Sequence, residues 1–183
     1  MAVLDYRYSI QLFFDHDTEK AVTSIINRLR DAGVVNGKFV GEHYRPHVSL
    51  AVYKSLDQAH ARHATQVVAT QFAPFRLTVS HIGVFNEEVK ALYLGPVVTA
   101  GLRALHVALH KHYSGRPEVC WNYYLPDHWT PHCGLLIDTS EGPIVEGVRL
   151  LMGTRLPDLV VESIAAVGFP DPVWYPFAGR QGA

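Results

Sequence analysis

The sequence lacks most of the features that would assign it to a specialised class. It has only two cysteines, Cys120 and Cys133, which form no CxxC pair and give no disulfide framework. Its charges nearly balance, with 16 Lys and Arg against 17 Asp and Glu, which argues against a broad basic surface that grips long duplex nucleic acid. No apolar run approaches the roughly 20 residues of a membrane helix. No glycine-rich phosphate loop or dinucleotide fingerprint occurs.

What remains is the composition of an ordinary globular protein. Hydrophobic residues make up 48% of the 183 residues, which is enough for a substantial apolar core in a single domain over 1–183. Asp5 and Arg7 stand where a signal peptide would need an unbroken apolar stretch. We therefore expect a soluble cytoplasmic protein with no membrane partner, most simply a monomer.

One motif occurs twice in the chain. HYRPHVSL begins at His43, and HWTPHCGL begins at His128, so that His47 and His132 lie 85 residues apart in matching contexts. A repeat of this kind indicates how the chain is organised before it indicates any chemistry.

The surrounding sequence repeats as well, over residues of about 8–85 and 90–169. Each half predicts a strand, a helix, a strand that starts at the motif histidine, a second helix and a closing strand. The expected strands are 8–14, 47–53, 75–85, 90–98, 132–137 and 159–169. The expected helices run from Asp17 or Thr18 to Gly33, over 57–71, over 99–114, and from about Pro143 to Met152. The pattern predicts an α+β fold of two packed, pseudo-symmetric lobes, with His47 and His132 facing each other across a central cleft.

Two facing imidazoles suit one class of reaction. With reference pKa values of about 6.5, one can take a proton while the other gives one near neutral pH. In-line displacement at a phosphodiester needs that pair of transfers. Ser49 shares a strand face with His47 and could donate to a phosphate oxygen, whereas Gly134 holds the matching position after His132.

These paired motifs, PHVSL and PHCGL, together with the duplicated element order, resemble the 2H phosphoesterases, the superfamily of the 2′-5′ RNA ligase-like proteins and cyclic nucleotide phosphodiesterases. The resemblance implies a bilobal fold, chemistry that uses no metal or other cofactor, and RNA ends or small nucleotides with 2′,3′-cyclic phosphates or 2′-5′ linkages as partners. By motif position it assigns catalysis to His47 and His132 and phosphate binding to Ser49. The sequence departs from the family at Gly134, where a hydroxyl is expected. The loss of one such donor costs about 3–4 kcal/mol of transition-state stabilisation.

Four further positions are candidates for substrate binding. Arg45 could meet a phosphate or simply be solvated, and the Gly134 backbone could approach a ligand or permit close packing. Tyr44 and Trp129 could stack on a base or pack beside the following strand. Further cleft candidates, for which core or rim packing is the simpler interpretation, are Tyr123, Tyr124, Trp174 and Tyr175.

Two alternatives stay open beside the phosphodiesterase. The first is a metal protein, because His106 and His110 have the i, i+4 spacing of a zinc site, although no glutamate completes the HExxH motif. The second is a catalytically weakened protein of the same fold that binds RNA ends or nucleotides. A mechanism with Cys133 as the nucleophile is disfavoured, because Cys133 faces away from His132 on a strand.

Overall fold

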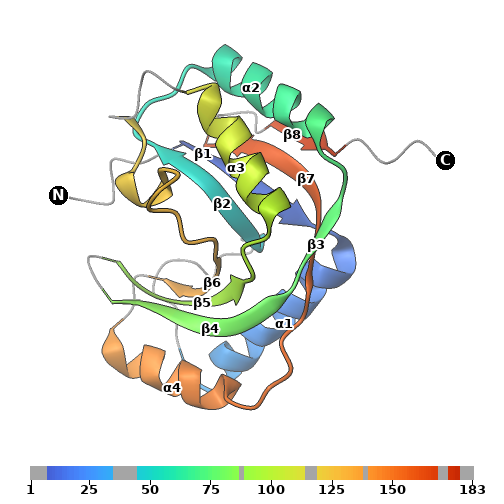
Figure 1. Ribbon diagram of the computed structural model, residues 1–183. Helices are drawn as coiled ribbons and strands as arrows, with labels where there is room; N and C mark the ends of the chain where they lie inside the picture. The colour runs from blue at the N-terminus through green and yellow to red at the C-terminus, as the bar shows by residue number, and fades with distance from the viewer. Residues whose placement is uncertain are drawn as a thin grey trace.

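A computed structural model describes residues 8–34, 45–86, 89–113, 119–137, 140–168 and 173–177. All paired strands are antiparallel and form two sheets, and the helices lie outside them (Figure 1). The strands are β1 (Tyr8–Phe14), β2 (His47–Tyr53), β3 (Phe75–Leu77), β4 (Val79–Asn86), β5 (Lys90–Pro96), β6 (Cys133–Ile137), β7 (Leu159–Val167) and β8 (Val173–Pro176). The predicted α+β class and the repeated element order are confirmed.

The helices begin close to the predicted positions. They are α1 (His16–Asp31), α2 (Gln58–Gln71), α3 (Ala100–Lys111) and α4 (Glu141–Leu151), with a 3₁₀ turn, η3, over Asn122–Tyr124. The predicted cap of α1 was wrong by two or three residues: Asp15 is the N-cap, and its carboxylate accepts a hydrogen bond from the Thr18 backbone at 2.9 Å. Thr99 caps α3 in the same way, through the Leu102 backbone N–H.

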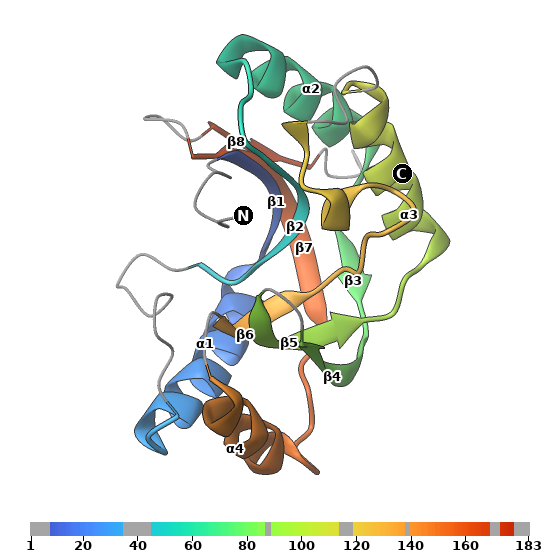
Figure 2. The ribbon, with the colours of Figure 1, turned by 90° about the vertical axis from the view of Figure 1, so that its left-hand side faces the viewer.

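The two sheets exchange elements between the halves of the sequence. One sheet has the order β2-β1-β7-β3, with β8 paired to β7, and the other has the order β4-β5-β6. The closing strand of the second half, β7, therefore lies beside the opening strand of the first half, and β4 lies beside β5. Helices α2 and α3 cover the first sheet, and α1 and α4 cover the second (Figures 1 and 2). Each lobe is built from both halves.

The exchange happens inside a segment that the sequence presents as a single strand. Residues 75–85 divide into β3, which pairs with β7, and β4, which pairs with β5. Thr78 stands between them and passes the chain from one sheet to the other. Hydrophobic alternation continues across this point, so the interpretation as one strand was natural but incomplete.

The alternation of the motif strand places its side chains as predicted. Val48 and Leu50 are fully buried in the core, and Ser49 and His47 point to the opposite face. On the neighbouring strand, Gln11 is paired with Ser49 and Phe13 with His47, so these four side chains share one face of the sheet. Among the described helices, none has both the length and the apolar character needed to cross a bilayer.

Candidate active site at the junction of the motif strands

The two motif strands meet where the sheets meet. β2 and β6 are each the edge strand of their sheet, and they contact one another. The Cys133 thiol is hydrogen-bonded to the His47 backbone, and the electrostatic interaction of His132 with His47 is strong enough to affect the pKa of His47. The structure thus brings the two motif histidines together at one place, which we call the histidine junction (His47, Ser49, Tyr124, His132 and Gly134).

Both imidazoles are oriented by the same local hydrogen bond. Nδ1 of His47 lies 2.8 Å from the Arg45 carbonyl oxygen, and Nδ1 of His132 lies 2.8 Å from the Thr130 carbonyl oxygen. A carbonyl oxygen can only accept, so Nδ1 carries the proton in each ring. The lone pair of each neutral imidazole is therefore on Nε2. In each motif the carbonyl that orients the imidazole belongs to the residue two positions before the histidine, so the two rings are equivalent proton carriers.

The surroundings of the pair favour neutral imidazoles. Burial, opposed by the hydrogen bond to Arg45 and assisted by the neighbouring His132, lowers the pKa of His47 to about 4. Burial likewise lowers the pKa of His132, opposed by the hydrogen bond to Thr130. Near pH 7 both rings are neutral in the free protein, and an anionic ligand between them would favour protonation.

Ser49 is held on both its backbone and its side chain. It is only 8% exposed, and its hydroxyl is hydrogen-bonded to the Tyr124 hydroxyl. Its carbonyl oxygen accepts a hydrogen bond of 3.0 Å from Nε1 of Trp129. Tyr124 in turn lies beside the second motif, with its ring centroid 6.2 Å from that of His132. The sequence pointed to Tyr124 only weakly, because nothing in its local pattern reveals a contact with residue 49.

The side chains of Trp129 and His106 pack together and hold the backbone near Ser49 and Tyr124 in place. Their rings are stacked with centroids 3.9 Å apart and parallel planes. Nε2 of His106 lies 3.0 Å from the carbonyl oxygens of both Leu50 and Tyr124, so a single N–H joins β2 to the η3 turn. The base contact expected of Trp129 stays a prediction; the contacts it makes within the protein orient Ser49.

The same hydrogen bonds bear on the zinc alternative. His106 Nε2 donates to backbone oxygens, and Nε2 of His110 lies 3.4 Å from the Leu50 oxygen. Burial, together with the neighbouring His110, lowers the pKa of His106 to about 3, so this imidazole is neutral. Within the described residues, no group of three or more His, Cys, Asp or Glu side chains is arranged to hold a metal ion.

Gly134 lies in an ordinary strand. It pairs with Tyr93 of β5, so it shares the face on which the Tyr93 and His132 rings meet at 5.5 Å. The described glycines with positive φ are elsewhere, at Gly33, Gly153 and Gly168. Backbone conformation therefore gives no reason why residue 134 must be glycine.

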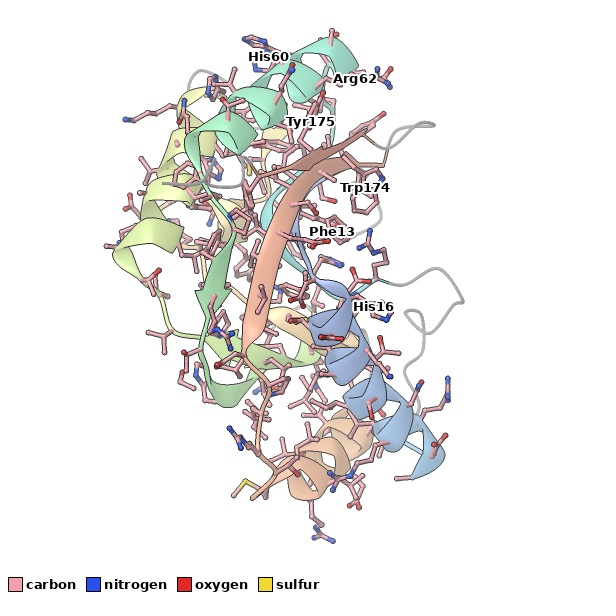
Figure 3. The ribbon with its side chains drawn as sticks, turned by 90° about the vertical axis from the view of Figure 1, so that its right-hand side faces the viewer. Phe13, His16, His60, Arg62, Trp174 and Tyr175 are labelled. Atoms are coloured by element: carbon pink, nitrogen blue, oxygen red, sulfur yellow. The ribbon has the colours of Figure 1, made fainter. Side chains whose placement is uncertain are left out.

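Arg45 is engaged on two sides. Its guanidinium forms an ion pair with Glu19 and lies over the rings of Phe13 and Trp174, 5.0 and 4.6 Å from their centroids. Figure 3 shows Phe13 and Trp174 on the same side of the molecule. These contacts fix the segment whose carbonyl orients His47, and the predicted phosphate contact of Arg45 stays a prediction. Tyr44 lies outside the described residues.

Aromatic rings from three elements surround His132. Phe85 meets the imidazole edge to face at 4.8 Å and stacks on Tyr93 at 4.4 Å. These packing residues come from β4 and β5, and sequence analysis could not find them because the exchange of β4 between the halves is not visible in the motif.

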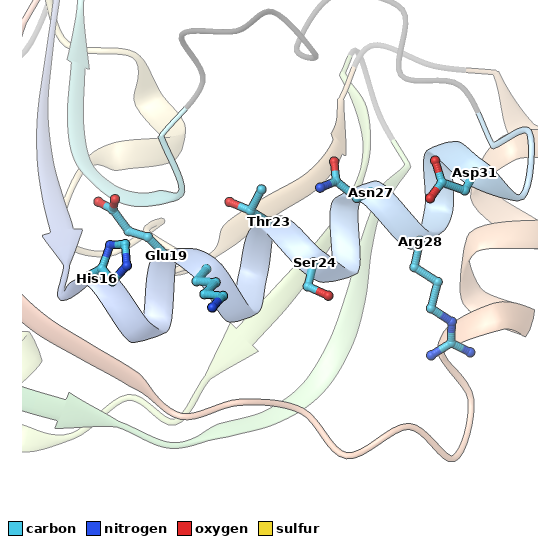
Figure 4. A pocket seen from close by; sticks show the side chains of 8 residues that line it. His16, Glu19, Thr23, Ser24, Asn27, Arg28 and Asp31 are labelled. Carbon is cyan, nitrogen blue, oxygen red and sulfur yellow. The ribbon is translucent and has the colours of Figure 1, made fainter.

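A separate hollow runs along the outer face of α1, from His16 past Glu19 to Asp31 (Figure 4). Glu19 connects it to the segment before His47 through the ion pair with Arg45. Its lining mixes Lys20 and Arg28 with the two acidic residues and holds none of the motif residues. It gives no reason to move the candidate site away from the junction.

Comparisons with known proteins agree with this arrangement. The family model of the 2′-5′ RNA ligase superfamily matches residues 16–146, which is more than half of the chain. No curated protein matches the sequence.

Several solved structures share the fold. Usb1 of Kluyveromyces marxianus is 11% identical with a TM-score of 0.59, and the match covers 92% of this chain and 97% of that one. TT0787 of Thermus thermophilus is 16% identical with a TM-score of 0.60, over 96% and 100% of the two chains. LigT of E. coli, solved with 3′-AMP, is 15% identical with a TM-score of 0.55, over 94% and 95%. The chain belongs to the 2′-5′ RNA ligase superfamily of 2H phosphoesterases.

Proposed function

We propose that this protein is a metal-independent phosphodiesterase that acts on 2′,3′-cyclic phosphates or 2′-5′ linkages at RNA ends or in small nucleotides. Membership of the superfamily supports phosphodiester chemistry on RNA ends or nucleotides. The finer assignment rests on one observation, the matched hydrogen bonds of 2.8 Å that leave the lone pair of His47 and of His132 on Nε2.

In the proposed reaction the two histidines have different roles. His47, whose pKa is lowered by burial and by its neighbour, is the general base: Nε2 takes a proton from water, and the water oxygen attacks phosphorus. His132 takes up a proton on Nε2 when the anionic phosphodiester binds; it is then the general acid and gives this proton to the ribose oxygen that leaves. For hydrolysis of a 2′,3′-cyclic phosphate, one P–O bond forms, one breaks, and a nucleoside monophosphate is released. Solvent returns the pair to its starting protonation.

Three other predicted residues support the reaction in this proposal, one at the phosphate and two through the segments that they hold. Ser49 donates from its hydroxyl to a non-bridging oxygen, where negative charge increases in the transition state. Trp129 and Arg45 act mainly through the segments they hold, because the first donates to the Ser49 carbonyl and the second is paired with Glu19. The substrate class agrees with the 3′-AMP that accompanies LigT.

We also propose, as the sequence leads us to expect, one domain over residues 1–183, a monomer and a cytoplasmic location.

A product screen tests the proposal. The purified protein is incubated with 2′,3′-cyclic nucleotides, 2′-5′ dinucleotides and cyclic-phosphate-ended RNA, with a chelator in excess. We expect one of these groups to give monophosphate or nucleoside product at a rate that the chelator leaves unchanged. Activity that the chelator removes and zinc or manganese restores would contradict the metal-independent mechanism.

The binding protein of the same fold is the second candidate, and Gly134 is the observation that favours it. A site without the second hydroxyl could hold an RNA end with little turnover. In that case nucleotides would raise the melting temperature of the protein, with no product formed over long incubation. The same screen, read by both melting temperature and product, separates the two functions.

A further inference from the structure

Tyr124 places a hydroxyl group between the two motifs. It ends the η3 turn, and its hydroxyl is hydrogen-bonded to the Ser49 hydroxyl of the first motif. Its ring lies beside the second motif, with the centroid 6.2 Å from that of His132. Tyr124 therefore connects the hydroxyl of the first motif with the surroundings of the histidine of the second motif.

The tyrosine is held rigidly for a residue outside the sheets. Its backbone N–H donates to the Trp121 oxygen at 2.9 Å, and its carbonyl accepts from His106 at 3.0 Å. Its side chain is 8% exposed. Hydrogen-bond donors that are fixed before the reaction need no reorganisation as charge develops, which is the condition for strong transition-state stabilisation.

The Tyr124 hydroxyl is suited to donate a hydrogen bond at neutral pH. Burial raises the pKa of Tyr124 to about 12, although the hydrogen bond with Ser49 acts in the opposite direction. The group therefore stays protonated at neutral pH and can donate to an anion, but it is unsuited to remove a proton.

The second motif lacks just such a donor. Gly134 occupies the family's hydroxyl position on the face that it shares with His132. Tyr93, its cross-strand partner, does not fill the need, because its ring and hydroxyl lie over Gly83 on β4, at the place where a Cβ of Gly83 would be.

We propose that Tyr124 supplies the phosphate donor that Gly134 lacks, so that Ser49 and Tyr124 together replace the usual pair of motif hydroxyls. The two hydroxyls satisfy each other in the free protein, and each turns its proton to a non-bridging oxygen when a phosphodiester enters. This inference rests on the proposed function, since it assigns a catalytic residue to that reaction.

The test compares four proteins on a 2′,3′-cyclic nucleotide with chelator present: the wild type, Tyr124→Phe, Gly134→Ser and the double variant. We expect Tyr124→Phe to lower kcat by about 10²–10³-fold with little change in KM, as for the loss of one preorganised donor. Gly134→Ser should raise the rate of Tyr124→Phe by at least about tenfold, and by a larger factor than it changes the wild-type rate, because a serine there restores one donor of this size.

Tyr93→Phe is the matched control, since it removes the same atom from a ring that also lies near His132. It should keep nearly the wild-type rate, and melting curves verify that every variant is folded. A Tyr124→Phe protein that is as active as the wild type, or an equal gain from Gly134→Ser in both backgrounds, overturns the inference while the proposed function stands. A wild type that yields no product overturns both.

Discussion

The hydrogen bonds from Nδ1 to backbone carbonyls explain why a short motif is enough to make a proton carrier. Arg45 and Thr130 each enter these hydrogen bonds through a backbone carbonyl oxygen, two residues before the histidine. Their side chains can therefore differ while the imidazoles stay equivalent. The sequence predicted the histidines and Ser49 because strand alternation fixes their face. It could not predict Tyr124, whose place depends on a turn held by His106.

The lowered pKa values of the histidine pair lead to a prediction about ligand binding. Burial keeps both rings neutral in the free protein near pH 7, with the pKa of His47 at about 4. A bound phosphate monoester stabilises the charged imidazolium, so the complex has the higher pKa and binding takes up a proton. The affinity for 3′-CMP should therefore fall as pH rises from the pKa of the free pair, which is about 4 for His47, toward the higher pKa of the complex.

Titration calorimetry in two buffers of different ionisation enthalpy measures this uptake directly. His132→Ala should reduce the uptake, and the same substitution at the exposed His63 on α2 is the control for the loss of one imidazole. Proton release on binding, or heats that do not depend on the buffer, would contradict the assigned protonation states.

The buried His106 predicts how the free energy of unfolding changes with pH. Burial lowers its pKa in the folded state to about 3, below the value of about 6.5 in an unfolded chain. The unfolded state therefore binds more protons between these values, and this contribution to the free energy of unfolding is lost as pH falls through that window. At pH 7, His106→Leu should cost about 1–3 kcal/mol, because the Leu50 and Tyr124 oxygens lose their buried donor.

Urea unfolding at pH 7 and pH 5 measures both effects. The difference in stability between wild type and His106→Leu should be smaller at pH 5, since only the wild type loses stability by protonation of this ring. A difference that grows toward pH 5 would show that the imidazole is charged in the folded protein.

At the level of elements, strand pairing explains the glycine in β4. Gly83 lies opposite Tyr93, and a Cβ on Gly83 would overlap the aromatic ring. Gly83→Ala should therefore displace Tyr93 from its stack on Phe85 and destabilise the protein by about 1–3 kcal/mol, the usual cost of overpacking. Thermal unfolding checks this prediction, with Gly142→Ala in α4 as the control, because a Cβ there meets nothing within 4 Å.

The control should be neutral or slightly stabilising, since alanine is the better helix former. Equal melting temperatures for Gly83→Ala and wild type would mean that Tyr93 moves without a cost in the free energy of unfolding.

The sequence predicted the existence and type of these elements well. It predicted the start of α1 too late, because Asp15, Asp17 and Thr18 are all good caps and only the structure shows that Asp15 receives the Thr18 N–H.

At the scale of the whole molecule, the exchange of β4 and β7 makes each lobe depend on both halves of the chain. β7 lies between β1 and β3, and β4 completes the sheet of β5 and β6. The repeat predicted two lobes and a histidine pair between them, but not that the lobes share their strands. Periodicity reports which face of a strand is buried and says nothing about which sheet receives it.

Splitting the chain after residue 87 tests this dependence. Each fragment alone should show no cooperative thermal transition, because it lacks the strands that complete its sheets, and mixing the two fragments should restore one. A fragment that unfolds cooperatively by itself would contradict the exchanged topology.

The most direct test of the account is the coupling between His47 and His132. Turnover of a 2′,3′-cyclic nucleotide is measured, with chelator, for wild type, His47→Ala, His132→Ala and the double variant, all verified as folded. If the two imidazoles act as one acid–base couple, each single substitution should lower kcat by at least about 10²-fold, and the double should be little slower than the slower single. Single variants that retain most of the wild-type rate, or losses that multiply in the double variant, would contradict the central claim that the two motifs form one catalytic pair.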